Sequence, residues 1–265
     1  MRPTVIATLL VLVTVPGTAA FGQQPTLSQD VAELTRLTPA IKNGADSRQR
    51  NDALHRVWRV GVTSIEPQVK LQAINLLAEP ANSGFDQVRM PAMYAISEIA
   101  RTTIDANVKT IAIARLANPL KAAQVPVRLH AVSIVEAITA NSSSVEVTMA
   151  AVNALAEPIG SGNNGVRMPA MMSLVRIVGN CAHEPACNKG IDLLLQPLRS
   201  TAGSGGMEVR MLAVANMEQL AMNSVSASAR GKVMGLLMAE SARGHWEPEA
   251  VARVQVAVKA IQARE

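Results

Sequence analysis

The segment VRMPAMYAISEIA (residues 88–100) returns three times with small changes and decides the fold of this chain. The later copies are VRLHAVSIVEAIT (127–139), VRMPAMMSLVRIV (166–178) and VRMLAVANMEQLA (209–221). The second residue of each copy is an arginine, and the four are Arg89, Arg128, Arg167 and Arg210. The first two steps between them are equal (128 − 89 = 167 − 128 = 39), and the third is slightly longer (210 − 167 = 43). Repetition at a fixed period of this size indicates a repeat architecture.

A second marker, a proline, keeps the same period. The members Pro80, Pro119, Pro158 and Pro197 are each 39 residues apart (119 − 80 = 158 − 119 = 197 − 158 = 39), and Pro39 precedes the first of them by 41 residues (80 − 39 = 41). Proline cannot donate to the helix ladder and its ring clashes with the preceding turn. Each proline therefore predicts a helix that ends or kinks there. Stretches such as GSGNNG (160–165), which follow the proline, predict loops.

The apolar spacing within the motif predicts a second helix in each repeat. In the first copy the apolar residues recur at i, i+4, i+7, i+8 and i+11, and they are Val88, Ala92, Ala95, Ile96 and Ile99. This is one stripe of a helix with 3.6 residues per turn. A small residue recurs at the second place of the stripe, where it lets a neighbouring helix approach closely; it is Ala92, Ala131, Ala170 or Ala213.

These patterns predict an all-α fold, an α-solenoid of about six antiparallel helix pairs. Hydrophobic residues make up 49% of the chain and aromatic residues only 2%, which suits closely packed helices. Degenerate copies of the motif occur at both ends of the chain. They place Arg50 at 39 residues before Arg89 (89 − 50 = 39) and Arg253 at 43 residues after Arg210 (253 − 210 = 43). Terminal repeats lose the consensus because one of their faces meets water. The expected repeats are about 27–63, 64–102, 103–141, 142–180, 181–223 and 224–265.

The period, the proline in the first helix and the Val-Arg-x-x-Ala opening of the second resemble HEAT repeats, in particular the short bacterial kind, over residues 27–265. The resemblance implies a scaffold whose second helices line a concave face. The family often has Asp just before Val-Arg, and Asp86 fits, whereas the other copies carry Gln124, Gly165 and Glu208 nearby. A regular Asp–Arg ladder is therefore not expected. Tetratricopeptide repeats have a period of about 34 residues, which does not fit.

The N-terminal segment MRPTVIATLLVLVTVPGTAAFG, residues 1–22, has the layout of a secretory signal. Arg2 precedes an apolar run at 5–15, and small residues around Ala20 offer a cleavage site. The run is too short to span a bilayer as a helix. The alternative is an uncleaved anchor or a buried N-terminal helix. We expect an exported protein, periplasmic or secreted, whose repeat domain covers 23–265, with no membrane span after cleavage.

Two rows of side chains are candidate binding surfaces. The row Arg89, Arg128, Arg167 and Arg210, extended by Arg50 and Arg253, could clamp carboxylates or phosphates, or could bond carbonyls and acids of the next repeat. The residue after each arginine points away from the apolar stripe. Together with Met172 this second row could form an adaptable peptide-binding groove, or could fill gaps between helices; it consists of Met90, Leu129, Met168 and Met211.

Cys181 and Cys187 are the only cysteines of the chain. In an exported protein, two cysteines with five residues between them most simply form a disulfide that closes a loop. His183 and Glu184 lie between them, but a metal site would need a fourth ligand that the sequence does not supply. We therefore expect a disulfide and no metal.

The function expected from these observations is an exported scaffold that binds a protein or a peptide, without a cofactor. The formal net charge of +5 leaves open a second hypothesis, a binder of an anionic envelope polymer or nucleic acid. Five aromatic residues leave little for base stacking, which argues against nucleic acid. A third hypothesis is a lyase-like or hydrolytic enzyme, which a few HEAT-like proteins are. The sequence contains no Gly-x-Ser-x-Gly, His-Glu-x-x-His or phosphate-binding loop, so we expect no enzyme.

Overall fold

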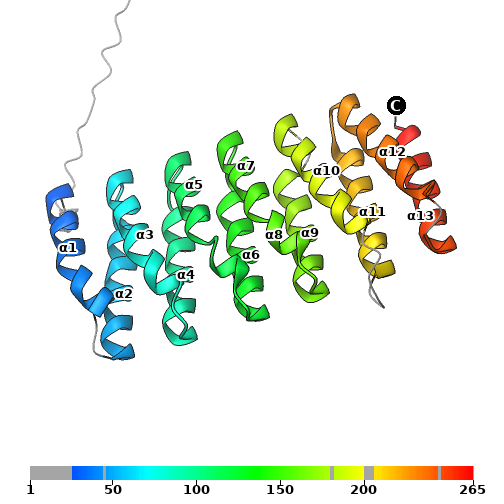
Figure 1. The fold of residues 1–265 in the computed structure, drawn as a ribbon. Coiled ribbons are helices and arrows are strands. Elements are labelled where there is room, and N and C mark those ends of the chain that lie inside the picture. The colour runs from blue at the N-terminus through cyan, green and yellow to red at the C-terminus, as the bar shows by residue number, and fades with distance from the viewer. Residues whose placement is uncertain (1–25, 44–45, 180–181, 200–205, 244–245, 265) are drawn as a thin grey trace, which may run out of the picture.

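The computed structural model describes residues 26–43, 46–179, 182–199, 206–243 and 246–264, and these fold into helix pairs stacked in single file (Figure 1). No strand occurs in these ranges. The first helices of the pairs are α1 (Leu27–Asn43), α3 (Pro67–Ala81), α5 (Ala106–Arg115), α7 (Val145–Ala154), α10 (Glu184–Leu198) and α12 (Ala227–Ser241). The second helices are α2 (Ser47–Thr63), α4 (Asp86–Arg101), α6 (Val125–Thr139), α9 (Asn164–Val178), α11 (Gly206–Asn223) and α13 (Pro248–Gln262). The predicted all-α solenoid is confirmed.

The helices form two layers. First helices pack against neighbouring first helices, as α3 does against α5, and second helices against second helices, as α4 does against α6. Extensive contacts in the described part of the chain stay within one pair or between adjacent pairs. The predicted stripe of the second helices fills the space between the layers, and its recurrent alanines are all fully buried: Ala92, Ala131, Ala170 and Ala213.

Four of the five periodic prolines break or end the first helices, as predicted, whereas Pro39 lies inside α1, which continues to Asn43. In the third repeat, α5 ends at Arg115 and Pro119 begins a short 3₁₀ helix, η1 (Pro119–Lys121). In the fourth, α7 ends at Ala154 and Pro158 lies in the short helix α8 (Ala156–Gly160). Both breaks come four residues before the proline, where its ring would clash with a carbonyl group. Pro80 and Pro197 are the penultimate residues of α3 and α10.

The first helices also begin at a periodic signal that the sequence analysis missed. Asp105 and Ser144, which are one period apart, each accept a hydrogen bond from the backbone N–H three residues further on, at 2.9 Å and 3.2 Å. Ser226 does the same for α12. These N-cap bonds satisfy a backbone donor that has no partner within the helix.

Buried lysines lie at the C-terminal ends of the second helices. The ammonium group of Lys70, a residue of α3, donates to the carbonyl of Gly61 in the last turn of α2 at 3.0 Å. It also donates to the hydroxyl of Thr102, which follows α4, at 2.8 Å. Lys109 lies one period later and donates to the carbonyl of Asn141, which follows α6, at 3.4 Å. A cation is favoured there, because the last carbonyl groups of a helix lack partners and carry negative charge.

Replacing a buried alanine of the stripe by leucine should destabilise the fold. Ala170 is fully buried in α9, and three added carbon atoms have no space between the layers. We expect Ala170→Leu to lower the free energy of unfolding by about 1–3 kcal/mol. Ala114→Leu, on the exposed face of α5, is the matched control and should change it little. Urea denaturation followed by circular dichroism checks both, and equal effects would contradict the assigned packing.

Burial also makes the contribution of Lys70 depend on pH. Desolvation lowers the pKa of the Lys70 ammonium below its usual value of 10.5. Between the lowered pKa and 10.5 the unfolded chain binds more protons than the native chain, so stability rises with pH in this window. We expect the stability of the wild type relative to Lys70→Met to increase from neutral pH to about 10.5. Substitution of the exposed Lys189 by methionine should not reproduce this increase.

Candidate functional site

The arginines of the predicted row cap the first helices of their own repeats. Nε of Arg50 donates to the carbonyl of Ile41, in the last turn of α1, at 3.1 Å. The equivalent bonds join Arg89 to the carbonyl of Ser83, just after α3, and Arg128 to the carbonyl of Leu120, in η1. The carbonyl groups at a helix end lack partners within the helix, and a guanidinium supplies several donors at once.

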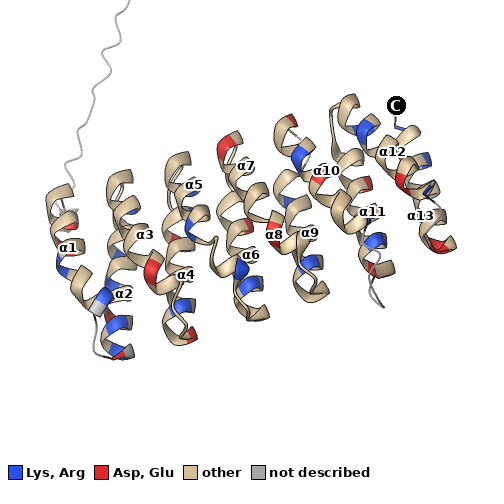
Figure 2. Cartoon of the chain, in the orientation of Figure 1, with Lys and Arg blue, Asp and Glu red and all other residues tan. Residues whose placement is uncertain are grey.

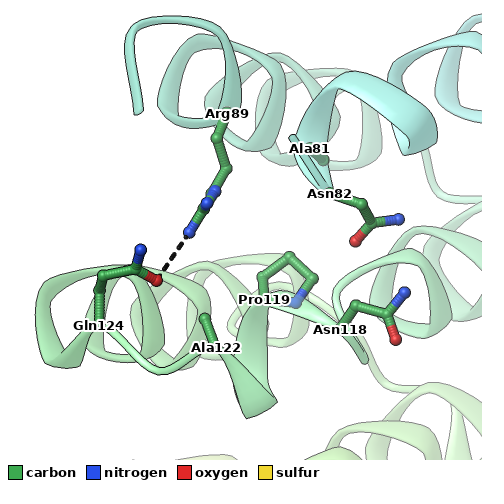
Figure 3. Close-up of a pocket in the computed structure, with 7 residues that line it drawn as sticks. All are labelled: Ala81, Asn82, Arg89, Asn118, Pro119, Ala122 and Gln124. Carbon is green, nitrogen blue, oxygen red and sulfur yellow. Dashed lines mark hydrogen bonds between the residues drawn. The ribbon is translucent and has the colours of Figure 1, made fainter. Parts of the chain in front are cut away.

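The same guanidinium groups also reach the following repeat. Nη1 of Arg89 donates to Oε1 of Gln124 at 3.1 Å across a pocket of about 220 Å³ (Figure 3). Nη2 of Arg128 donates to Oε2 of Glu157 in α8 at 3.0 Å. Arg210 donates to both carboxylate oxygens of Glu247, which precedes α13.

Burial places these arginines within the packing between repeats. Their side chains are 8%, 13% and 5% exposed, for Arg89, Arg128 and Arg210 respectively. The pKa of Glu247 is lowered, first by a backbone hydrogen bond and then by the guanidinium of Arg210. Arg167 is half-buried in α9, and burial lowers its pKa. The geometry of the row thus favours a structural role over a ligand clamp.

Arg253 does not continue this row, contrary to the expectation from the sequence. The buried residues Ala250 and Val254 of α13 match Val209 and Ala213 of α11, so the two helices correspond at a smaller offset than Arg210 and Arg253 do. Arg253 therefore stands two positions beyond the place of Arg210. It binds Glu218 of the preceding repeat instead of the following one. The spacing between Arg210 and Arg253 was wrongly taken as one repeat, because α13 lacks the Val-Arg-x-x-Ala opening that fixes the alignment.

The residues after the arginines are partly buried, Leu129 included. Met90, Met168 and Met211 pack against the core. Met172 differs, because 39% of it is exposed. It occupies the sixth position after the motif valine, as does Tyr94, which is 54% exposed. The residues at this position in the first five repeats form what we call the outer row: His55, Tyr94, Ser133, Met172 and Ala215.

A pocket of about 290 Å³ lies between α2 and α4 at the N-terminal end of the outer row, and we call it the α2/α4 pocket. The rings of His55 and Trp58 meet there edge to face, with centroids 4.8 Å apart. Two buried polar atoms of the lining, Nε1 of Trp58 and Oδ1 of Asn51, have no hydrogen-bond partner among the described residues. The full lining is Asn51, Leu54, His55, Trp58, Pro91, Tyr94 and Ala95.

This pocket was not predicted. The motif in α2 is degenerate, and Trp58 has no aromatic counterpart at the same place in other repeats. A signal was present, because Trp58 and Tyr94 are two of only five aromatic residues in the chain. They come from different repeats, and only the packing of α2 against α4 brings them close together.

A larger groove of about 540 Å³ lies on the layer of first helices. Its lining includes Gln68, Gln72 and Asn75 of α3, and the charges of Lys42 and Glu79 have opposite signs. Oδ1 of Asn75 already accepts a hydrogen bond from Arg115 at 2.7 Å. The groove therefore favours neither sign of ligand charge, and none of its lining residues is aromatic.

The disulfide prediction falls partly outside the described residues. Cys187 is fully buried in α10, whereas Cys181 lies in the undescribed range 180–181. The disulfide therefore stays a prediction. Within the described residues, no group of three or more His, Cys, Asp and Glu side chains could hold a metal ion. No helix among them has both the length and the apolar character that a membrane span requires.

Loss of a capping arginine should destabilise the protein. In Arg128→Ala, the carbonyl of Leu120 and the carboxylate of Glu157 lose their donor. We expect the free energy of unfolding to fall by about 1–3 kcal/mol, as for other unsatisfied buried polar groups. Arg48→Ala, at an exposed position of α2, is the control and should be nearly neutral. Denaturant titrations compare the two, and an unchanged stability of Arg128→Ala would reopen the ligand-clamp interpretation.

Comparison with known proteins supports the fold. No protein-family model matches the chain, and no curated protein matches it. Among solved structures, a designed armadillo repeat protein in complex with the peptide (KR)4 is 18% identical, with a TM-score of 0.51, and the match covers 86% of this chain and 99% of that one.

Two further structures are similar in the same way. A second designed armadillo repeat protein is 19% identical, with a TM-score of 0.49, over 89% of this chain and 100% of that one. An archaeal HEAT-like repeats protein from Thermococcus onnurineus NA1 is 9% identical, with a TM-score of 0.48, over 89% of this chain and 93% of that one. At these identities the likeness concerns the fold alone, and the match with a TM-score of 0.51 supports an armadillo-like repeat fold.

Proposed function

We propose that this repeat scaffold binds a peptide segment of a protein partner along its layer of second helices, with one side chain of the peptide in the α2/α4 pocket. The observation that carries the proposal is the pocket itself. It gathers Trp58, Tyr94 and His55 in a chain of which only 2% is aromatic. Exposed aromatic side chains beside a hollow are typical of the central residues of protein interfaces.

Two further features fit a peptide better than a compact apolar ligand. Nε1 of Trp58 and Oδ1 of Asn51 are a donor and an acceptor without partners among the described residues. Both atoms are buried, so a peptide main chain, which carries one N–H donor and one carbonyl acceptor per residue, pairs with them only where the lining of the pocket moves aside. The outer row continues from the pocket to Met172, so an extended ligand would meet further apolar surface. A designed armadillo repeat protein of similar fold is in complex with a peptide, which supports a peptide as the ligand.

Export is part of the proposal. The layout of residues 1–22 supports a secretory signal, although these residues lie outside the described ranges. In an exported protein the partner would be a periplasmic or extracellular protein. An anionic envelope polymer or nucleic acid remains the alternative ligand, and no enzymatic activity is proposed.

Tryptophan fluorescence can test peptide binding directly. In Trp246→Phe, Trp58 is the only indole of the chain, and it lines the pocket. We expect peptides selected from a random linear library to shift the emission of Trp58. Tyr94→Ala should weaken their binding at least tenfold, about 1.4 kcal/mol, because the peptide loses an aromatic contact.

Phe85→Ala is the matched control, because Phe85 is also exposed but lies outside the lining of the pocket. It should leave the affinity unchanged. Selected peptides that bind equally well to Tyr94→Ala and leave the Trp58 emission constant would remove the pocket from the binding surface.

A further inference from the structure

The charges around the α2/α4 pocket indicate which peptides it selects. Helix α2 carries four arginines and one aspartate, a formal charge of +3. Helix α4 carries two arginines and two acidic residues, so it adds no net charge. Figure 2 shows blue bands along α2. One wall of the pocket therefore belongs to a positively charged helix.

Two of these arginines lie on the same side of α2 as His55. Arg48 precedes His55 by seven residues and Arg59 follows it by four, spacings that keep all three on one helix face. Arg48 and Arg59 are exposed, and no salt bridge among the described residues involves either of them. Arg48 also stands in the first turn of α2, where the carboxylate of Asp46 accepts a hydrogen bond from the backbone N–H of Gln49 and offsets part of the positive potential of the helix dipole.

The other charges near the pocket are balanced. Arg56 points toward α1, where Glu33 binds both Arg56 and Arg36. On α4, Glu98 is paired with Arg101 at 2.7 Å. Asp52 is the one carboxylate of α2, and its single negative charge offsets only one of the two positive charges of Arg48 and Arg59. An excess of positive charge thus remains on the face that carries His55.

We propose that the preferred occupant of the α2/α4 pocket is an acidic peptide, with an apolar side chain in the pocket and a carboxylate at each of Arg48 and Arg59. This inference rests on the proposed peptide-binding function and adds the sign and spacing of the ligand charges. It differs from the arginine row expected from the sequence, because Arg89, Arg128 and Arg210 are occupied by bonds to their own or the next repeat.

The helix geometry sets the spacing of the ligand. A rise of about 1.5 Å per residue puts Arg48 about 10.5 Å and Arg59 about 6 Å from His55 along the axis of α2. An extended peptide advances by about 3.3 Å per residue, so these separations correspond to about three and two residues. A peptide that runs along α2 then matches the pattern Glu-x-x-Leu-x-Glu, or its reverse in the opposite direction. Leucine suits a pocket of about 290 Å³ that Leu54, Pro91 and Ala95 help to line.

The test uses Trp246→Phe protein and two sets of peptides. One set is acetyl-Ser-Glu-Ser-Ser-Leu-Ser-Glu-Ser-amide and its reverse, and the other has glutamine or lysine in place of both glutamates. At about 50 mM salt, where exposed charges are weakly screened, we expect the glutamate peptide, in one direction, to bind at least tenfold more tightly than its glutamine analogue. At about 500 mM salt this ratio should shrink, because ions screen exposed charges.

Substitution of the arginines separates charge recognition from the pocket. The double variant Arg48→Gln/Arg59→Gln should lose the preference for glutamate and keep the affinity for the glutamine peptide. Arg56→Gln is the matched control, since it removes an arginine of the same helix that faces α1, and it should retain the preference. Melting temperatures of both variants should stay close to that of the parent, because the substituted side chains are exposed.

Three results would overturn the inference. Equal binding of the glutamate and glutamine peptides, or tighter binding of the lysine peptide, would exclude acid recognition while peptide binding stands. A short single-stranded DNA that binds more tightly than the glutamate peptide, and depends on Arg48 and Arg59, would assign the surface to nucleic acid. If neither these peptides nor library-selected ones shift the emission of Trp58, the proposed function fails together with the inference.

Discussion

Carbonyl groups at helix ends are the constraint on which this fold depends. Every helix leaves its last carbonyls without intrahelical partners, and each helix pair of the stack adds two such ends, one in each layer. The chain meets this need with buried cations: arginines at the ends of first helices, as Arg128 at Leu120, and lysines at the ends of second helices, as Lys70 at Gly61. Because Arg128 also binds Glu157, one side chain both ends a helix and joins two repeats.

The fold could be predicted from the sequence because its determinants are local and repeated. The helical stripe, the alanine within it and the proline near the end of the first helix act within one repeat, and four copies make them visible. The N-caps Asp105 and Ser144 keep the same period, as do the capping lysines Lys70 and Lys109. They were missed because each pair has few other copies. At the corresponding place of the fourth repeat stands Thr148, so the lysine series ends after two members.

The candidate site was less predictable because it depends on what the repeats do not share. The periodic pattern singles out the arginines and methionines, and most of them are buried or partly buried. The α2/α4 pocket arises from single residues of adjacent repeats, Trp58 and Tyr94, which no pattern connects. Arg48 and Arg59 are likewise outside the motif. In a repeat fold the consensus residues are those that pack the repeats together, whereas binding surfaces form from exposed residues that differ from the consensus.

Contacts that stay between neighbours also bear on folding kinetics. The hydrogen bonds described between repeats join residues 29 to 44 positions apart, from Arg128 with Glu157 to Lys232 with Asn188. Each interface thus closes a chain loop of roughly one period, whatever the number of repeats. Loop-closure entropy grows slowly, by about 0.6 kcal/mol for each doubling of loop length, and here the loop does not lengthen as the stack grows. The fold can therefore extend repeat by repeat, with an entropic barrier set by the period and not by the total length of the chain.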